Sequence, residues 1–146
     1  MLATDSHLDL RGEVQAFYDW YSDTASLDRS TATVLAVLPQ VLSPDLRTLL
    51  QADEKCKDAS QSICNIEFDP FLNSQDPCAR YEVRAPVPHG DTLAFPIYPN
   101  CAWMRDTAPA LIALALPLDS GWVFTNFIYG GGSADLRTIL SRPVTE

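Results

Sequence analysis

The sequence contains no apolar run long enough to cross a membrane, and it contains few of the residues that bind metals. Its longest apolar stretch covers residues 110–118, whereas a membrane-spanning helix needs about 18 apolar residues or more. There are only two histidines, His7 and His89, and no CxxC motif. Their positions do not match the ligand spacing of known zinc sites. We therefore expect no membrane-spanning segment, no bound metal and no cofactor.

Basic residues are also scarce. The chain has 10 lysines and arginines against 19 acidic residues, which gives a net charge of −9. Nucleic acids and anionic membrane surfaces both require clustered basic side chains, so neither is expected as a partner. The charge instead suits a soluble protein with a cationic or neutral partner. A length of 146 residues with 47% apolar content predicts a single domain, residues 1–146, whose core spans about 10–142.

Four cysteines lie in the middle of the chain, at Cys56, Cys64, Cys78 and Cys101. An even number without metal-type spacing predicts two disulfides, for which three pairings are possible. We favour the sequential pairing, in which Cys56 bonds Cys64 across a helix end and Cys78 bonds Cys101 across the loops beside two strands. Residues 1–7 do not have the pattern of a signal peptide. An oxidised chain would then be a mature periplasmic or secreted protein, and the alternative is a cytoplasmic protein with four free thiols.

The N-terminal part of the chain has helical periodicity. An apolar stripe from Leu10 to Tyr21 predicts a helix that the polar run 22–30 interrupts. A second helix is predicted over residues 31–38. The tripeptide Ser43-Pro44-Asp45 is typical of a third helix start, because serine caps helices, proline suits the first position and aspartate complements the helix dipole.

Beyond residue 80 the apolar pattern changes to strict alternation, which predicts strands. The strands are expected at residues 81–87, 93–97, 110–118 and 122–129. Pro96 predicts that the second of these lies at a sheet edge or a bulge. In the last strand, alternation assigns Phe124 and Phe127 to opposite faces.

Residues 133–135 then cap a short final helix that contains Leu136, Ile139 and Leu140. Helices followed by antiparallel strands predict an α+β fold. We expect the N-terminal helices to pack inside a curved antiparallel sheet that forms a cone with one open end, and the short C-terminal helix to follow the sheet.

Four short blocks of the sequence resemble a known family. They are residues 17–21 (FYDWY), residues 69–76 (DPFLNSQD), Gly121-Trp122 together with residues 127–129 (FIY), and residues 135–140 (DLRTIL). Together they are similar to a bacterial family of unknown function, often secreted or lipid-anchored, within the nuclear transport factor 2-like, or cone-fold, superfamily. The resemblance covers about residues 11–142. It implies the cone fold and export but no activity, because this superfamily includes isomerases, dehydratases, ligand-binding domains and interaction modules.

Few residues qualify as catalytic groups. The polar candidates for an acid or base inside the cone are Asp69, Asp76, Tyr18 and Tyr98. Partners for such a base are scarce in the expected strands, so no catalytic residue is assigned. The acidic stretch around Asp69 and Asp76 has the ligand types of a calcium site but not its spacing. Both aspartates precede a proline, and capping of a turn explains them better.

Partner recognition fits the remaining candidates. Trp103 and Arg105 stand in a long loop between strands and are of the residue types found at interface hot spots. The alternative is that Trp103 fills the core beneath a disulfide. Trp20 is offset from the first helical stripe, so we place it near the rim of the cone. Asp69 and Asp76 complete the candidate binding residues.

We therefore expect a non-enzymatic, extracytoplasmic binding module that recognises a protein partner. One form of this function is an immunity or inhibitor protein that neutralises a basic secreted toxin or enzyme. The net charge of −9 and the missing catalytic set motivate this hypothesis. The alternative is a small-ligand-binding protein, or a cone-fold enzyme of the isomerase or dehydratase type, that uses the apolar interior.

Overall fold

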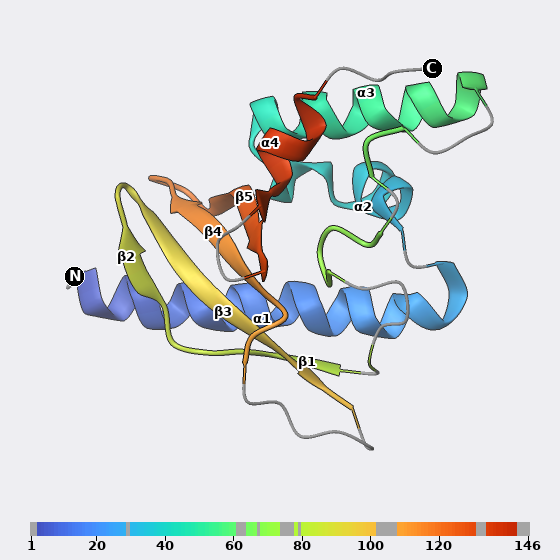
Figure 1. Ribbon diagram of the computed structural model, residues 1–146. Coiled ribbons are helices and arrows are strands. Elements are labelled where there is room, and N and C mark those ends of the chain that lie inside the picture. Colours follow the sequence, from blue (N-terminus) through green and yellow to red (C-terminus); the bar gives the residue numbers. More distant parts are fainter. Residues whose placement is uncertain are drawn as a thin grey trace.

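The computed structural model describes residues 3–28, 30–60, 64–66, 68–73, 78, 80–101, 108–130 and 134–142. Its elements, in chain order, are α1 (Ala3–Asp28), α2 (Thr31–Val37), the 3-10 helix η1 (Pro39–Val41), α3 (Pro44–Ser60), β1 (Arg80–Val83), β2 (Val87–His89), β3 (Thr92–Asn100), β4 (Leu111–Pro117), β5 (Trp122–Tyr129), β6 (Ala134–Asp135) and α4 (Leu136–Leu140). Helices come first, an antiparallel sheet follows, and a short helix comes last (Figure 1). The predicted α+β class and order are confirmed.

Helix α1 is longer than predicted at both ends. The sequence pattern predicted a helix from Leu10 to Tyr21, whereas α1 runs over Ala3–Asp28. The prediction was wrong because the polar run after Tyr21 contains neither proline nor glycine. Polarity by itself does not end a helix, since stop signals come from those two residues.

The starts of the other helices follow the predicted capping chemistry. The backbone N–H of Leu46 donates to Ser43 Oγ at 3.3 Å, so Ser43 caps α3. The carboxylate of Asp135 accepts from the N–H of Thr138 at 3.1 Å and caps α4. Each cap satisfies a backbone donor that the first helical turn leaves open. Both helices therefore begin where the sequence predicted.

The sheet has the order β1-β3-β4-β5-β6, with β2 also paired to β3, and every pair is antiparallel. Pro96 lies inside β3, which has neighbours on both sides, so its predicted place at a sheet edge was wrong. It does lie at an irregularity, because the chain takes four steps from Val83 to Val87 opposite the three from Ile97 to Ala94. The Pro96 carbonyl accepts from the N–H of Arg84 at 3.0 Å. Proline has no backbone N–H to donate. The backbone nitrogen of Pro96 faces the β1–β2 side of β3, at the point where the chain leaves the sheet between these two strands. No hydrogen bond to β4 is lost.

A β-bulge in β5 changes which side chains reach the core. Leu114 pairs with Asn126 and Ala115 with Phe124, so Thr125 is an extra residue. A bulge shifts the alternation by one position. Phe124 and Phe127 therefore lie in the same core cluster, and the prediction that they face opposite sides was wrong.

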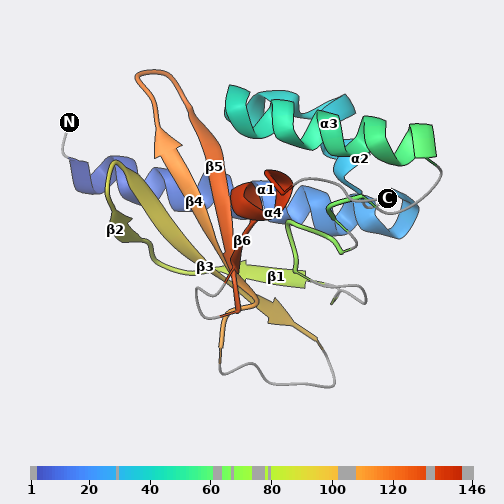
Figure 2. The ribbon, with the colours of Figure 1, turned by 45° about the horizontal axis from the view of Figure 1, so that its top comes forward.

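Helix α1 crosses one side of the curved sheet, and α2, α3 and α4 gather near β5 (Figures 1 and 2). One cluster of buried side chains joins these layers. Its centre is aromatic: the ring of Phe17 lies 5.1 Å from Phe124 and 5.8 Å from Phe71, centroid to centroid. The edge of β5 is covered by residues 42–43, since the N–H of Ser43 donates to the Phe124 carbonyl at 2.9 Å.

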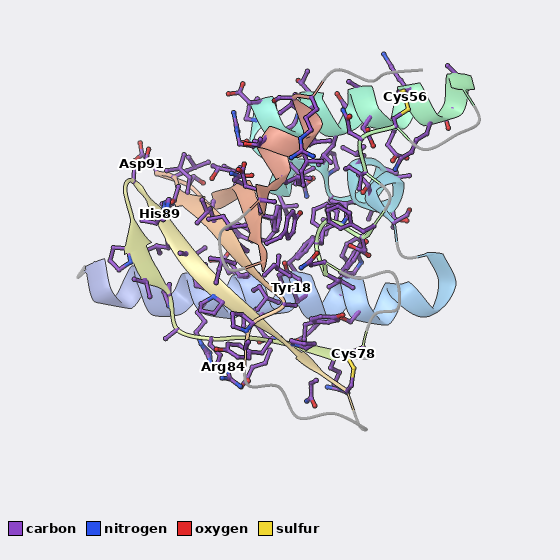
Figure 3. All side chains as sticks on the ribbon, viewed as in Figure 1. Tyr18, Cys56, Cys78, Arg84, His89 and Asp91 are labelled. Carbon is purple, nitrogen blue, oxygen red and sulfur yellow. A yellow bond between two sulfur atoms is a disulfide. The ribbon has the colours of Figure 1, made fainter. Side chains whose placement is uncertain are left out.

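Two disulfides connect the predicted cysteine pairs (Figure 3). Cys56 on α3 bonds Cys64, with the Cα atoms 6.2 Å apart. Cys78, before β1, bonds Cys101, directly after β3, with the Cα atoms 4.9 Å apart. The sequential pairing is confirmed, and the bonds indicate an oxidising, extracytoplasmic environment. No helix in the described part of the chain has the length and apolar character needed to cross a bilayer.

Candidate functional site

The interior between α1 and β5 holds a short chain segment, residues 68–73, which we call the inner segment. Phe71 and Leu72 in this segment are fully buried. The Phe71 ring packs edge-on against Tyr21 at 5.4 Å and Phe127 at 5.3 Å, centroid to centroid. Side chains of this size pack the interior between α1 and β5.

Three tyrosine hydroxyls hold the inner segment. Tyr18 on α1 donates to the Phe71 carbonyl at 2.8 Å, and Tyr129 on β5 donates to the Pro70 carbonyl at 2.7 Å. Tyr21 donates to Asp69 Oδ2 at 2.7 Å. Buried polar groups need partners, and here the phenols from two elements and the segment satisfy one another.

Asp69 shapes the inner segment from within. Its Oδ1 accepts from the N–H of Phe71 at 3.0 Å and of Leu72 at 3.2 Å. Its carbonyl accepts from the N–H of Asn73 at 2.7 Å. These bonds form the turn that the sequence predicted for an aspartate before proline. The carboxylate therefore has a structural use in orienting Phe71 inward.

Burial raises the pKa of Tyr18 well above its ordinary value, and the nearby Tyr129, Asp69 and Tyr81 raise it further. Burial is also the main cause of the raised pKa of Tyr129, followed by Asp69 and Asp135. Both phenols therefore keep their protons at neutral pH and act as hydrogen-bond donors. This arrangement is suited to holding the inner segment and unsuited to accepting a proton.

The raised pKa values predict a loss of stability in alkali. Above a pH of about 10, tyrosines ionise in the unfolded chain, while Tyr18 and Tyr129 remain protonated in the fold. Proton release then favours unfolding, by up to about 1.4 kcal/mol per pH unit for each phenol. Urea unfolding at several pH values from about 9 to 11 measures this slope. The Tyr18→Phe/Tyr129→Phe variant should have a shallower slope, and an equal slope would contradict the prediction.

The predicted site residues fall in different places. Asp69 is half-buried beside the aromatic core, and Trp20 is half-buried against the rings of Phe17 at 6.0 Å and Tyr21 at 6.2 Å. Trp103, Arg105 and Asp76 lie outside the described residues. The structure thus brings two of the five candidates next to the aromatic core.

Tyr98 does not lie in the interior that sequence reasoning considered for it. Its neighbour Ile97 is in the core cluster, so Tyr98 faces the other side of the sheet, where the Arg84 guanidinium lies 3.5 Å from its ring centroid. The hydroxyls of Tyr21 and Tyr129 were not predicted as interior groups. The available signal was tyrosine, rather than phenylalanine, at positions expected to be buried, since a buried tyrosine usually has a hydrogen-bond partner.

Comparison of this chain with protein-family models, curated proteins and solved structures finds no match. Among the described residues, no three histidine, cysteine, aspartate or glutamate side chains are grouped so that they could hold a metal ion. The resemblance to a cone-fold family therefore rests on the four sequence blocks.

Proposed function

We propose that this protein is a non-enzymatic binding module that acts outside the cytoplasm and recognises a protein partner. The observation that carries the proposal is the filled interior. Fully buried Phe71 occupies it, and the hydroxyls of Tyr18 and Tyr129 are bonded to the inner segment. Recognition then takes place on the outer surface. The two disulfides support the extracytoplasmic setting.

The alternative function, a ligand carrier or an enzyme built on the cone fold, has less support. It would need the inner segment to leave the space that Phe71 fills. An enzyme would also need a group able to take a proton, whereas the buried phenols of Tyr18 and Tyr129 stay protonated. The carboxylate of Asp69 is bonded to the turn and to Tyr21.

The chemistry of the partner follows from the charge of the chain. A net charge of −9 attracts a cationic protein and speeds its encounter more than it tightens the final complex. We propose an immunity or inhibitor role toward a basic secreted toxin or enzyme, with Trp103 and Arg105 as anchor residues. Aromatic and arginine side chains supply most of the affinity in such interfaces.

Binding kinetics test this proposal. The probe is a basic secreted toxin or enzyme of the proposed class, measured by surface plasmon resonance over a salt series. Raising the salt should slow association several-fold and leave dissociation nearly unchanged. Trp103→Ala should speed dissociation by about thirtyfold, corresponding to about 2 kcal/mol. Val37→Ala on α2, which is 56% exposed, is the control and should bind normally.

Two results would contradict the proposed function. One is an association rate that salt does not change, which would remove the role of the acidic charge. The other is a Trp103→Ala variant with unchanged dissociation, which would move the contact away from this loop. Binding of a small molecule by the unmodified protein, blocked by Tyr18→Phe, would favour the alternative function.

A further inference from the structure

The sheet carries apolar side chains on the side opposite the core. Because residues alternate along β3 and β4, Phe95 and Ala113 lie in the core cluster while their neighbours Pro96 and Ile112 point away from it. We call this surface the outer face. It consists of Val87, Pro96, Ile112, Leu114, Leu116 and Ile128.

The strand register makes the outer face continuous. Pro96 pairs with Ile112, and Ile112 pairs with Ile128, so these three form one row across β3, β4 and β5. Val87 and Leu114 form the next row, because both pair with Ala94. Directly opposed side chains in a sheet share a face and lie in contact. The rows therefore form one apolar patch on four strands.

The described residues leave this patch partly open. None of its six side chains belongs to the core cluster. Val87 is 58% exposed and Leu114 is buried at 6%, while Pro96, Ile112, Leu116 and Ile128 are half-buried. Strand β4 is apolar on both faces, a pattern typical of strands that are covered on both sides. Helix α1 crosses only one side of the sheet (Figures 1 and 2). A contiguous apolar patch that is only partly covered is typical of an interaction surface.

Charged side chains along one border of the outer face indicate what covers it. In order along this border stand Arg80, Glu82 and Arg84 on and after β1, then Asp91 in the β2–β3 turn, all exposed. Arg84 is held by Glu82 at 2.9 Å. These four charges cancel, although the whole chain carries −9. The border is basic at the Arg80 end and acidic at the Asp91 end.

We propose that the outer face binds a second copy of this chain, with the two sheets face to face and their strands in opposite directions. The twofold axis of this dimer lies in the plane of the face and runs across the strands, passing between Pro96 and Ala94. It places the Arg80 end of the charged border of one copy over the Asp91 end of the same border in the other copy. The apolar rows then cover one another. A uniformly basic or acidic partner would meet a like charge at one end of this border.

The size of the patch fits this occupant. Four strands spaced about 4.8 Å apart and three side-chain rows, the third being that of Leu116 on β4, give an apolar centre of roughly 300 Å². A standard interface buries about 800 Å² on each partner, with a polar rim around such a centre. We therefore expect a dimer with a dissociation constant in the micromolar range. This proposal stands independently of the proposed function.

Sedimentation equilibrium of the full chain tests the proposal. Between about 1 µM and 1 mM, the mass should rise from the monomer value of 16.1 kDa toward twice that value. Val87→Lys and Ile112→Lys should each weaken the dimer at least tenfold, because they place a desolvated charge in the apolar centre. Val37→Lys, at an equally exposed site on α2, should leave it unchanged. Val87 is exposed enough that its variant will fold.

Charge reversal tests the orientation of the two copies. Arg80→Asp and Asp91→Arg should each weaken the dimer about tenfold, and the double variant should return to within about threefold of the original constant. A wild-type mass of 16.1 kDa at every concentration overturns the proposal. A dimer that neither Val87→Lys nor Ile112→Lys weakens overturns the choice of face. A double variant that is not restored overturns the opposed arrangement.

Discussion

Removing the Cys78–Cys101 disulfide should lower the free energy of unfolding by about 3–4 kcal/mol, more than removing Cys56–Cys64, which should cost about 2–3 kcal/mol. The reason is the length of chain that each bond closes. Cys78 and Cys101 are 23 residues apart in sequence, against 8 for the other pair. A longer loop loses more freedom in the unfolded chain when its ends are joined. The Cys78–Cys101 bond also connects the start of β1 to the end of β3.

The comparison needs both cysteines of a pair replaced together, so that no free thiol remains. Urea unfolding of Cys78→Ala/Cys101→Ala and of Cys56→Ala/Cys64→Ala measures the two losses. For a domain of this size the larger loss corresponds to a fall in the unfolding temperature of about 10 °C. A larger loss for the Cys56–Cys64 pair would show that contacts around α3, rather than loop length, set the contribution of each bond.

Features set by neighbouring residues could be predicted from the sequence. Ser43 and Asp135 cap α3 and α4 because each offers an oxygen to a backbone donor three residues ahead. The apolar run 110–118 became β4, and the change of period near residue 80 correctly separated helices from strands. These elements are decided within a few residues of chain, where capping and periodicity act.

Features set by distant residues could not be predicted in this way. The bulge at Thr125 depends on how β5 pairs with β4, and no local pattern in β5 indicates the extra residue. Pro96 is tolerated inside β3 because the chain leaves the sheet opposite it, at Arg84 directly after β1. Strand pairing depends on residues far apart in the sequence, so alternation alone assigned Phe124 and Phe127 to opposite faces.

In the candidate site, too, neighbouring residues decide the local conformation and distant residues decide its position. The turn at Asp69 follows from aspartate before proline, and the structure confirms it. That this turn carries Phe71 into the interior depends on Tyr18 and Tyr129, which stand 53 and 59 residues from their partners. The sequence pattern therefore gave the conformation of the inner segment but not its location. Trp103 and Arg105 stay predictions.

Phe71→Ala should lower the free energy of unfolding by about 3–5 kcal/mol, because it removes a fully buried ring from the aromatic centre and leaves a cavity. The loss includes edge-on ring contacts with Phe17, Tyr21 and Phe127. Phe68→Ala is the matched control in the same segment. Its ring is half-buried and packs on Tyr129 at 5.2 Å, so we expect about 1–2 kcal/mol. Thermal or urea unfolding of both variants gives the comparison.

The same variant separates the two functional hypotheses. If the interior is packed core, Phe71→Ala is strongly destabilised, and the cavity it opens binds a small apolar probe such as benzene that the unmodified protein does not bind. If the interior is a working ligand site, the inner segment must leave it at little cost. Phe71→Ala would then lose no more stability than Phe68→Ala, and the unmodified protein would bind the probe as well. That outcome would transfer recognition from the outer surface to the interior and contradict the proposed binding module.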